Sequence, residues 1–301
     1  HWSINQYTVT FNSNGGSAVS SKTVNHGSAI GTLPVTTRSG YTFLGWYTAT
    51  SGGVQVTTGT VISNNITLYA QWKQNLCTVS FDVNGGNGQQ YMSNKSLAWG
   101  STFGDNLYSA PGAPAGKYFV GWFDDASAGK QYTEDSIVPS QSNFTLYAHY
   151  EYNSYTIVYD GNGQTNGMMK NTQAKYNESV KLSDNAYIKD NHVFTGWNTK
   201  ADGSGTSYKD GAYVKDLTMS KDGIVHLYAQ WKEKEYVISF DVNGGYGEQF
   251  IGGEHLYLKK GDAYGHLPAG PTPVTGHEFA GWFTAKSGGT KIEEDSIFNG
   301  T

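Results

Sequence analysis

The sequence predicts an α+β protein that is mainly β, built as a tandem array of small β-grasp-like modules with the order strand, strand, short helix, strand, strand. A Gly-Trp pair inside an aromatic strand occurs four times, and its tryptophans, Trp46, Trp122, Trp197 and Trp282, lie 75 to 85 residues apart. An alternating strand precedes each pair, and another follows each of the first three. A regular period of this length indicates internal repetition.

Each module begins with a strand whose first, third and fifth side chains are apolar or aromatic, at residues 7–11, 77–81, 155–159 and 236–240, with Cys77 in a position otherwise held by Tyr. Such alternation predicts one buried face. The strand runs into an Asn- and Gly-rich turn, such as Asn14-Gly15-Gly16, because these residues adopt the positive φ of tight hairpins. A second strand is expected over residues 19–24, with less clearly alternating counterparts near residues 90–97, 168–176 and 250–258.

The middle of the module predicts one or two helical turns. Residues 27–34 and 261–268 place Ser or Asp before a few helix-compatible residues and end at Gly and Pro. The Gly-Trp strand follows, and a closing strand comes last, at residues 66–72, 144–150 and 225–231. If the closing strand lies beside the first strand, both aromatic faces are buried in one core. The predicted core residues are Trp46, Trp72, Trp122, Tyr150, Trp197, Trp231 and Trp282.

Module boundaries follow from a fixed spacing of five positions between the last aromatic of a closing strand and the start of the next first strand. The spacing defines repeats 1 to 4 as residues 1–74, 75–152, 153–233 and 234–301, with His1 and Trp2 as the tail of a preceding repeat. We expect repeat 4 to lack its closing strand unless another chain supplies one. Links of about four residues restrict rotation between repeats, which predicts an elongated rod.

The three markers in this order resemble the Listeria-Bacteroides repeat, also called the internalin B-type repeat, over residues 3–301. Repeat 1 shows them at residues 8–11, 40–47 and 66–72, with the Asn-Gly-Gly turn at residues 14–16. The resemblance implies a β-grasp-like fold, tandem copies in a bacterial cell-surface protein, and a role as spacer or adhesive stalk. Repeat 3 departs most, because it lacks the middle-segment Pro and has Asn198 after its tryptophan. That departure affects its local loop geometry.

Composition argues against several classes of protein. Charged residues make up 15% of the chain and the net charge is −5, so a basic surface for nucleic acid is not expected. The sequence contains no run of eighteen apolar residues, so no membrane span is expected in this segment. One cysteine, Cys77, cannot form an internal disulfide, and we interpret it as a substitution at a strand start.

Catalytic and cofactor-binding residues are not expected, because the eight histidines are scattered and the paired carboxylates recur in equivalent turns. Asp160, Asn162 and Gln164 place oxygen atoms on alternate residues, as calcium loops do, yet they occupy the hairpin turn and lack a bidentate Glu. We interpret them as a turn. Trp99 lies outside the repeat markers. It either contacts a glycan or protein partner or packs beside the middle segment, and we favour packing.

These features predict an extracellular protein, secreted or on the bacterial cell surface, in which the repeats form the structural spacer of an adhesin. The alternative hypotheses are a multivalent binding module for host or cell-wall glycan or protein, and a segment that self-associates into filaments through exposed sheet edges or the vacant strand position of repeat 4.

Overall fold

A computed structural model describes residues 1–246 and 255–300 of the chain. The chain divides into two compact units, His1–Glu151 and Tyr152–Thr301, each of which contains two repeats. The described residues form β-strands and two short 3-10 helices, Gln89–Tyr91 and Gly104–Asn106, and they contain no α-helix. The fold is therefore mainly β, as predicted. No helix in the described ranges is long and apolar enough to cross a membrane.

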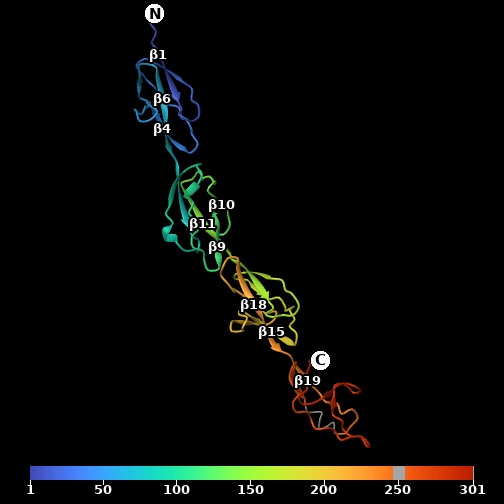
Figure 1. Ribbon diagram of the computed structural model, residues 1–301. Helices are drawn as coiled ribbons and strands as arrows, with labels where there is room; N and C mark the ends of the chain where they lie inside the picture. The colour runs from blue at the N-terminus through green and yellow to red at the C-terminus, as the bar shows by residue number, and fades with distance from the viewer. Residues whose placement is uncertain (247–254, 301) are drawn as a thin grey trace. The chain divides into compact units, whose positions relative to one another are not determined.

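The main sheet of repeat 1 is mixed, and the closing strand lies at its centre. The strands β1 (Gln6–Asn12), β2 (Lys22–Asn25), β4 (Tyr41–Tyr47) and β6 (Ile66–Gln74) are ordered β2-β1-β6-β4 (Figure 1). Strand β6 runs parallel to β1, with Val9 opposite Ile66. It runs antiparallel to β4, with Trp46 opposite Ala70. The closing strand thus lies beside the first strand, as the sequence predicts.

Repeats 2 and 3 have the same arrangement with one more short strand each. Their sheets are ordered β10-β9-β11-β7-β8 and β13-β12-β18-β15-β16. The strands of repeat 2 are β7 (Leu76–Asp82), β8 (Lys95–Ala98), β9 (Lys117–Phe123), β10 (Gln131–Tyr132) and β11 (Asn143–Tyr152). Those of repeat 3 are β12 (Ser154–Asp160), β13 (Thr172–Lys175), β15 (His192–Asn198), β16 (Ser207–Tyr208) and β18 (Gly223–Glu233).

The second strands of repeats 1 to 3 are shorter than the sequence predicts, because β2, β8 and β13 span four residues each. In repeat 4, the described part of the second strand is β20 (Leu256–Lys259). Residues 250–254 of the strand expected over residues 250–258 lie outside the described residues. Weak alternation in these segments agrees with their short pairing.

Residues 27–34 and 261–268 do not form the predicted helical turns, whereas the equivalent segment of repeat 2 contains the 3-10 turn Gly104–Asn106. In repeat 1, β3 (Ser28–Ala29) pairs with β5 (Val61–Ile62), and in repeat 3, β14 (Ser179–Lys181) pairs with β17 (Tyr213–Lys215). Backbone N–H groups that a helix would use internally donate across this ladder, as Ile30 does to the carbonyl of Thr60 at 2.8 Å. Ile30 is 1% exposed and lies in the core. The segment is therefore extended because it buries Ile30 and pairs with a distant strand.

Glycine is required in the Gly-Trp pair because its φ is positive and because a Cβ atom would lie too close to a neighbouring residue. Gly45 has φ +131°, and a Cβ there would lie 2.8 Å from the side chain of Gln55. Gly196 has φ +141°, and its Cβ would lie 2.7 Å from the carbonyl oxygen of Tyr208. The pairing of β4 and β15 with their closing strands shifts register at these glycines. A β-bulge therefore precedes each tryptophan and directs it into the core.

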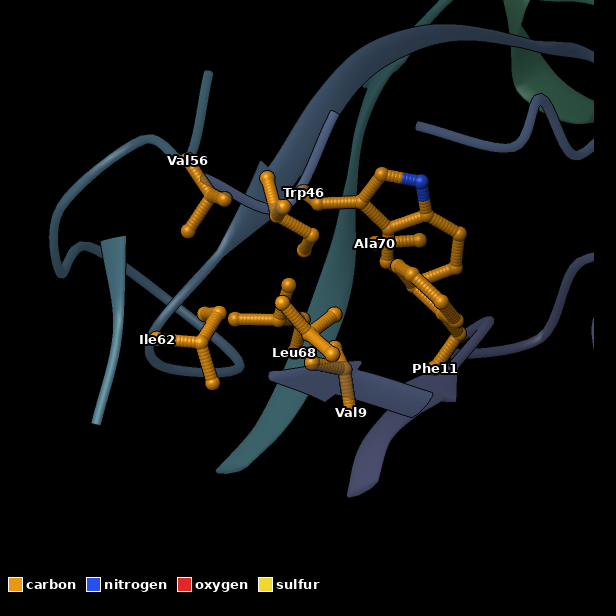
Figure 2. Packing of buried hydrophobic residues seen from close by; sticks show 9 residues of the cluster. Val9, Phe11, Trp46, Val56, Ile62, Leu68 and Ala70 are labelled. Atoms are coloured by element: carbon orange, nitrogen blue, oxygen red, sulfur yellow. The ribbon is translucent and has the colours of Figure 1, made fainter. Parts of the chain in front are cut away.

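Each of the first three repeats has its own aromatic core. In repeat 1, nine buried residues form one cluster, seven of which are labelled in Figure 2. The ring of Phe11 packs edge-on against the indole of Trp46, with centroids 4.7 Å apart. The Trp46 indole Nε1 donates to the carbonyl of Pro34 at 2.7 Å. Equivalent clusters surround Trp122 and Trp197. Such cores make each repeat a separate packing unit.

Repeat 4 is two separate ladders in the residues that the structure describes. Strand β19 (Glu235–Ile238) pairs with β20, and β21 (Trp282–Phe283) pairs with β22 (Lys291–Ile292). Its Gly-Trp strand is two residues long, against seven in β4, β9 and β15. Among the described residues, the cluster at Trp282 contains one other buried residue, Val242.

Replacing Trp46 by alanine is expected to destabilise repeat 1 by about 3–5 kcal/mol, because it leaves a cavity between Phe11 and Leu68. Leu44 lies on the opposite face of the same strand and is 43% exposed. Leu44→Ala should therefore change stability by less than about 1 kcal/mol. Differential scanning calorimetry of the full chain measures both. Equal effects of the two substitutions would contradict the assigned core.

Candidate functional site

The same asparagine occurs in the hairpin turn of all four repeats. Its backbone is left-handed, with φ of +46° to +49°, at Asn14, Asn84, Asn162 and Asn243. Its backbone N–H donates to the side-chain oxygen of the residue two positions earlier, at 2.8–2.9 Å, and these residues are Asn12, Asp82, Asp160 and Asp241. This side-chain turn holds the asparagine in one orientation.

The side chain of this asparagine connects the turn to the closing strand. Its amide Nδ2 donates to the carbonyl of the closing-strand alanine, at 3.1 Å from Asn14 to Ala70, 3.0 Å from Asn84 to Ala148 and 2.9 Å from Asn162 to Ala229. In repeats 2, 3 and 4 the same nitrogen also donates to the Gly-rich turn after the Gly-Trp strand, at Ala126, Ala201 and Lys286. We call Asn14, Asn84, Asn162 and Asn243 the asparagine clamp.

A second group of donors reaches the same turn from the closing strand. Trp72 and Trp231 donate their indole Nε1 to the carbonyls of Ser13 and Gly161 at 3.1 and 2.9 Å, and the Tyr150 hydroxyl donates to Val83 at 2.9 Å. Burial, together with the nearby Asp82 carboxylate, raises the pKa of Tyr150. The hydroxyl therefore stays protonated, as a donor, at neutral pH.

These aromatic rings also explain the last glycine of the turn. A Cβ on Gly16 would lie 2.4 Å from the ring of Trp72, and one on Gly86 would lie 2.0 Å from the Tyr150 hydroxyl oxygen. Only glycine leaves room for the closing aromatic at this contact. The Asn-Gly-Gly sequence thus supplies a hydrogen-bond donor, a tight turn and room for the aromatic side chain of the closing strand.

The calcium-type residues of repeat 3 lie in this hydrogen-bonded turn. The Asp160 side-chain oxygen Oδ1 accepts from the backbone N–H of Asn162, and the Asn162 amide points to the carbonyls of Ala201 and Ala229. Gln164 is exposed, and its side chain lies over Gly161. In the part of the chain that is described, no group of three or more His, Cys, Asp or Glu side chains could hold a metal ion.

The predicted core aromatics divide into two positions. Trp46, Trp122, Trp197 and Trp282 are 1%, 3%, 0% and 9% exposed. Trp72, Tyr150 and Trp231 are half-buried and pack at the edge of the same clusters. Cys77 is fully buried, and its position opposite Leu97 matches that of Tyr155 opposite Ala174. Burial raises the pKa of the Cys77 thiol.

Trp99 lies where repeat 1 meets repeat 2. It is half-buried, packs against the core cluster of repeat 2, and donates its indole Nε1 to the carbonyl of Gln141 at 2.9 Å. Its backbone N–H donates to the carbonyl of Asn75 at 3.1 Å. The choice between packing and partner contact for Trp99 stays a prediction.

Single residues join the repeats. Asn75 alone separates β6 from β7, and Lys234 alone separates β18 from β19. The backbone N–H of Asn75 donates to Gly40 of repeat 1, and its carbonyl accepts from Trp99 of repeat 2. The N–H of Lys234 donates to Asn191 of repeat 3 at 2.7 Å. Each junction residue is therefore hydrogen-bonded to the repeat that precedes it. Asn75 is also hydrogen-bonded to the repeat that follows it.

Three modules of one sheet order, joined by single residues, define a tandem-repeat protein. The family model of the Listeria-Bacteroides repeat domain matches residues 7–71, 78–149, 155–230 and 236–300. The chain belongs to this family, which confirms the resemblance seen in the sequence.

Three longer proteins are similar to this chain. A putative membrane protein of Evansella cellulosilytica is 37% identical over 79% of this chain and 35% of its own length. A putative Gly-rich membrane protein of the same species is 29% identical over 95% of this chain and 31% of its own length. Internalin H of Listeria monocytogenes is 32% identical over 49% of this chain and 25% of its own length. The chain thus spans about a third or less of these relatives.

The clamp predicts a specific effect of Asn84→Gly, which keeps the left-handed backbone and removes the side-chain amide. Repeat 2 should lose about 1–3 kcal/mol of stability, because the carbonyls of Ala126 and Ala148 lose their shared donor. The exposed Asn94, changed to Gly, is the matched control and should shift stability by no more than about 1 kcal/mol. Urea unfolding followed by hydrogen exchange in repeat 2 measures both. Identical midpoints would show that the clamp does not hold the closing strand.

Proposed function

We propose that this chain is a structural spacer in a secreted or cell-surface bacterial protein, where it holds an adhesive domain away from the cell envelope. Membership of the repeat family supports this proposal. The names of the relatives, two membrane proteins and an internalin, support the same location. In this proposal the repeats supply length, and the rest of the protein supplies the activity.

The junction residues carry this proposal. A spacer needs modules that fold separately and links that resist bending. Each complete repeat has its own buried cluster. Asn75 is hydrogen-bonded to the repeats on both sides of it. A one-residue link with these bonds leaves far less rotational freedom than a flexible tether.

The fold of the module is proposed to be a β-grasp sheet without its helix. The order β2-β1-β6-β4, with parallel first and closing strands at the centre, supports this. The β3-β5 ladder takes the place in which the sequence predicts a helix. The core lies between the main sheet and the β3-β5 ladder, so aromatic side chains fill the space that a helix face would otherwise fill.

Multivalent binding of glycan or protein from the host or the cell wall is the second candidate function. Tyr47 and Tyr69 are paired across β4 and β6 on the face opposite the core. In repeat 2, Phe123 stacks on His149 with centroids 4.0 Å apart. Aromatic side chains on an outer sheet face are suitable anchors for a repeated, weak contact.

The spacer proposal predicts an elongated particle in solution. Small-angle X-ray scattering of residues 1–301 should give a pair-distance distribution with a long tail. Inserting a flexible Gly-Ser segment after Asn75 should broaden that distribution and leave the calorimetric transitions of the repeats in place, because it separates the two strands without entering either core. A compact particle would contradict the proposal, as would an insertion that leaves the distribution unchanged.

A further inference from the structure

Seven asparagines of the chain are followed directly by glycine, and the structure places them in different surroundings. They are Asn14, Asn84, Asn87, Asn162, Asn166, Asn243 and Asn299. Glycine has no side chain to hinder the approach of its backbone nitrogen to the preceding side chain, so an Asn-Gly pair is prone to cyclisation. Four of the seven form the asparagine clamp, and Asn166 differs from these four.

Asn166 lies on the surface of repeat 3, in the loop that follows the hairpin turn. Asn166 and Gly167 are both exposed. The backbone N–H of Gly167 donates to the Asn166 side-chain oxygen Oδ1 at 2.7 Å. Among the described residues, this is the one Asn-Gly pair in which the glycine N–H donates to the asparagine before it. The nitrogen is thus held beside the carbonyl group that it would attack, and water has access to both.

The backbone on both sides of this contact is fixed. The N–H of Asn166 donates to the Ile188 carbonyl at 3.1 Å, and the N–H of Ile188 donates to the Asn166 carbonyl at 2.9 Å. Gly167 has φ +89°, and a Cβ there would overlap the carbonyl oxygen of Ala186. Residue 167 must therefore be glycine, and the pairing with Ile188 holds the Asn-Gly pair in its arrangement.

The clamp asparagines have the same Asn-Gly sequence and the opposite environment. Asn162, four residues before Asn166, has a left-handed backbone with φ +49°. Its amide Nδ2 donates to the carbonyls of Ala201 and Ala229 at 2.8 and 2.9 Å. Nδ2 is the atom that leaves when the side chain cyclises, so these two hydrogen bonds hold the leaving group in place. Asn162 is therefore protected for as long as repeat 3 is folded.

We propose that Asn166 is a site of spontaneous modification, at which the Gly167 nitrogen displaces ammonia from the asparagine side chain. A bond forms between the Gly167 nitrogen and Cγ of Asn166, and the bond from Cγ to Nδ2 breaks. Nδ2 leaves as ammonia together with the proton of the Gly167 N–H. Water then opens the resulting five-membered succinimide at either carbonyl carbon, which gives aspartate or isoaspartate. Water is the only co-reactant in these steps.

The products change repeat 3 at the pairing of Asn166 with Ile188. In isoaspartate the chain continues through Cγ, so the carbonyl that accepts from the Ile188 N–H becomes part of a free carboxylate. Both products also add a negative charge near Asp190, whose carboxylate accepts a hydrogen bond from the neighbouring Thr165 hydroxyl at 3.0 Å. The modification therefore weakens the contact between this loop and the middle segment of repeat 3.

Peptide mapping by mass spectrometry tests the proposal on the full chain, incubated at mildly alkaline pH in water enriched in the heavy oxygen isotope. Conversion at Asn166 should be at least about tenfold faster than at Asn162, because the attacking nitrogen of Gly167 is in place and the leaving group of Asn162 is held by the clamp. The products should carry heavy oxygen from the water. The rate at Asn166 should rise with pH, because the attacking nitrogen must lose its proton.

Unfolding the chain supplies the matched control. In guanidinium chloride the two Asn-Gly pairs lose their different surroundings, so their conversion rates should come within about threefold of each other. Asn166→Gln should suppress conversion at this position and leave Asn162 unchanged, because a glutamine side chain would have to close a larger ring. The proposal is overturned if Asn162 converts as fast as Asn166 in the folded chain. It is also overturned if the same difference persists in the unfolded chain, because the neighbouring sequence would then explain it.

Discussion

The position of the closing strand is the constraint on which the rest of each module depends. It pairs with the first strand on one side and the Gly-Trp strand on the other, although the chain reaches it last. Its inward leucine and alanine are fully buried in all three complete repeats. The first strand and the Gly-Trp strand do not pair with each other and are joined only through the closing strand. The sheet and the core are therefore expected to form together. In the described residues of repeat 4, β19 pairs with β20 and β21 pairs with β22.

The asparagine clamp connects this central strand to two loops. A buried carbonyl without a donor is costly, and one amide that serves both the closing-strand alanine and the Gly-rich turn satisfies two carbonyls. The clamp therefore holds the hairpin turn against the sheet. The junction residue follows the closing strand directly, and the first strand of the next repeat begins after it. Fixing the closing strand in its sheet therefore also fixes where the next repeat begins.

Periodicity in the sequence predicts the strands, the aromatic core and the central place of the closing strand, since these depend on local alternation and on which faces are apolar. The middle segment was predicted wrongly. Ser28 and Pro34 are typical helix boundaries, but the N–H of Ile30 pairs with Thr60, a contact that local signals do not contain. The clamp was recognised only as a turn. Its signal was an Asn or Asp two positions before the turn asparagine in every copy.

The central claim, that the closing strand completes each sheet, is tested most directly by hydrogen exchange resolved along the full chain. Residues 155–160 and 192–198 flank β18 in repeat 3. The account predicts that Leu227→Asp, which places a charge at a fully buried position of β18, makes both flanking segments exchange at least about tenfold faster, whereas residues 6–12 and 41–47 of repeat 1 keep their protection. Unchanged protection of the two flanking segments would contradict it.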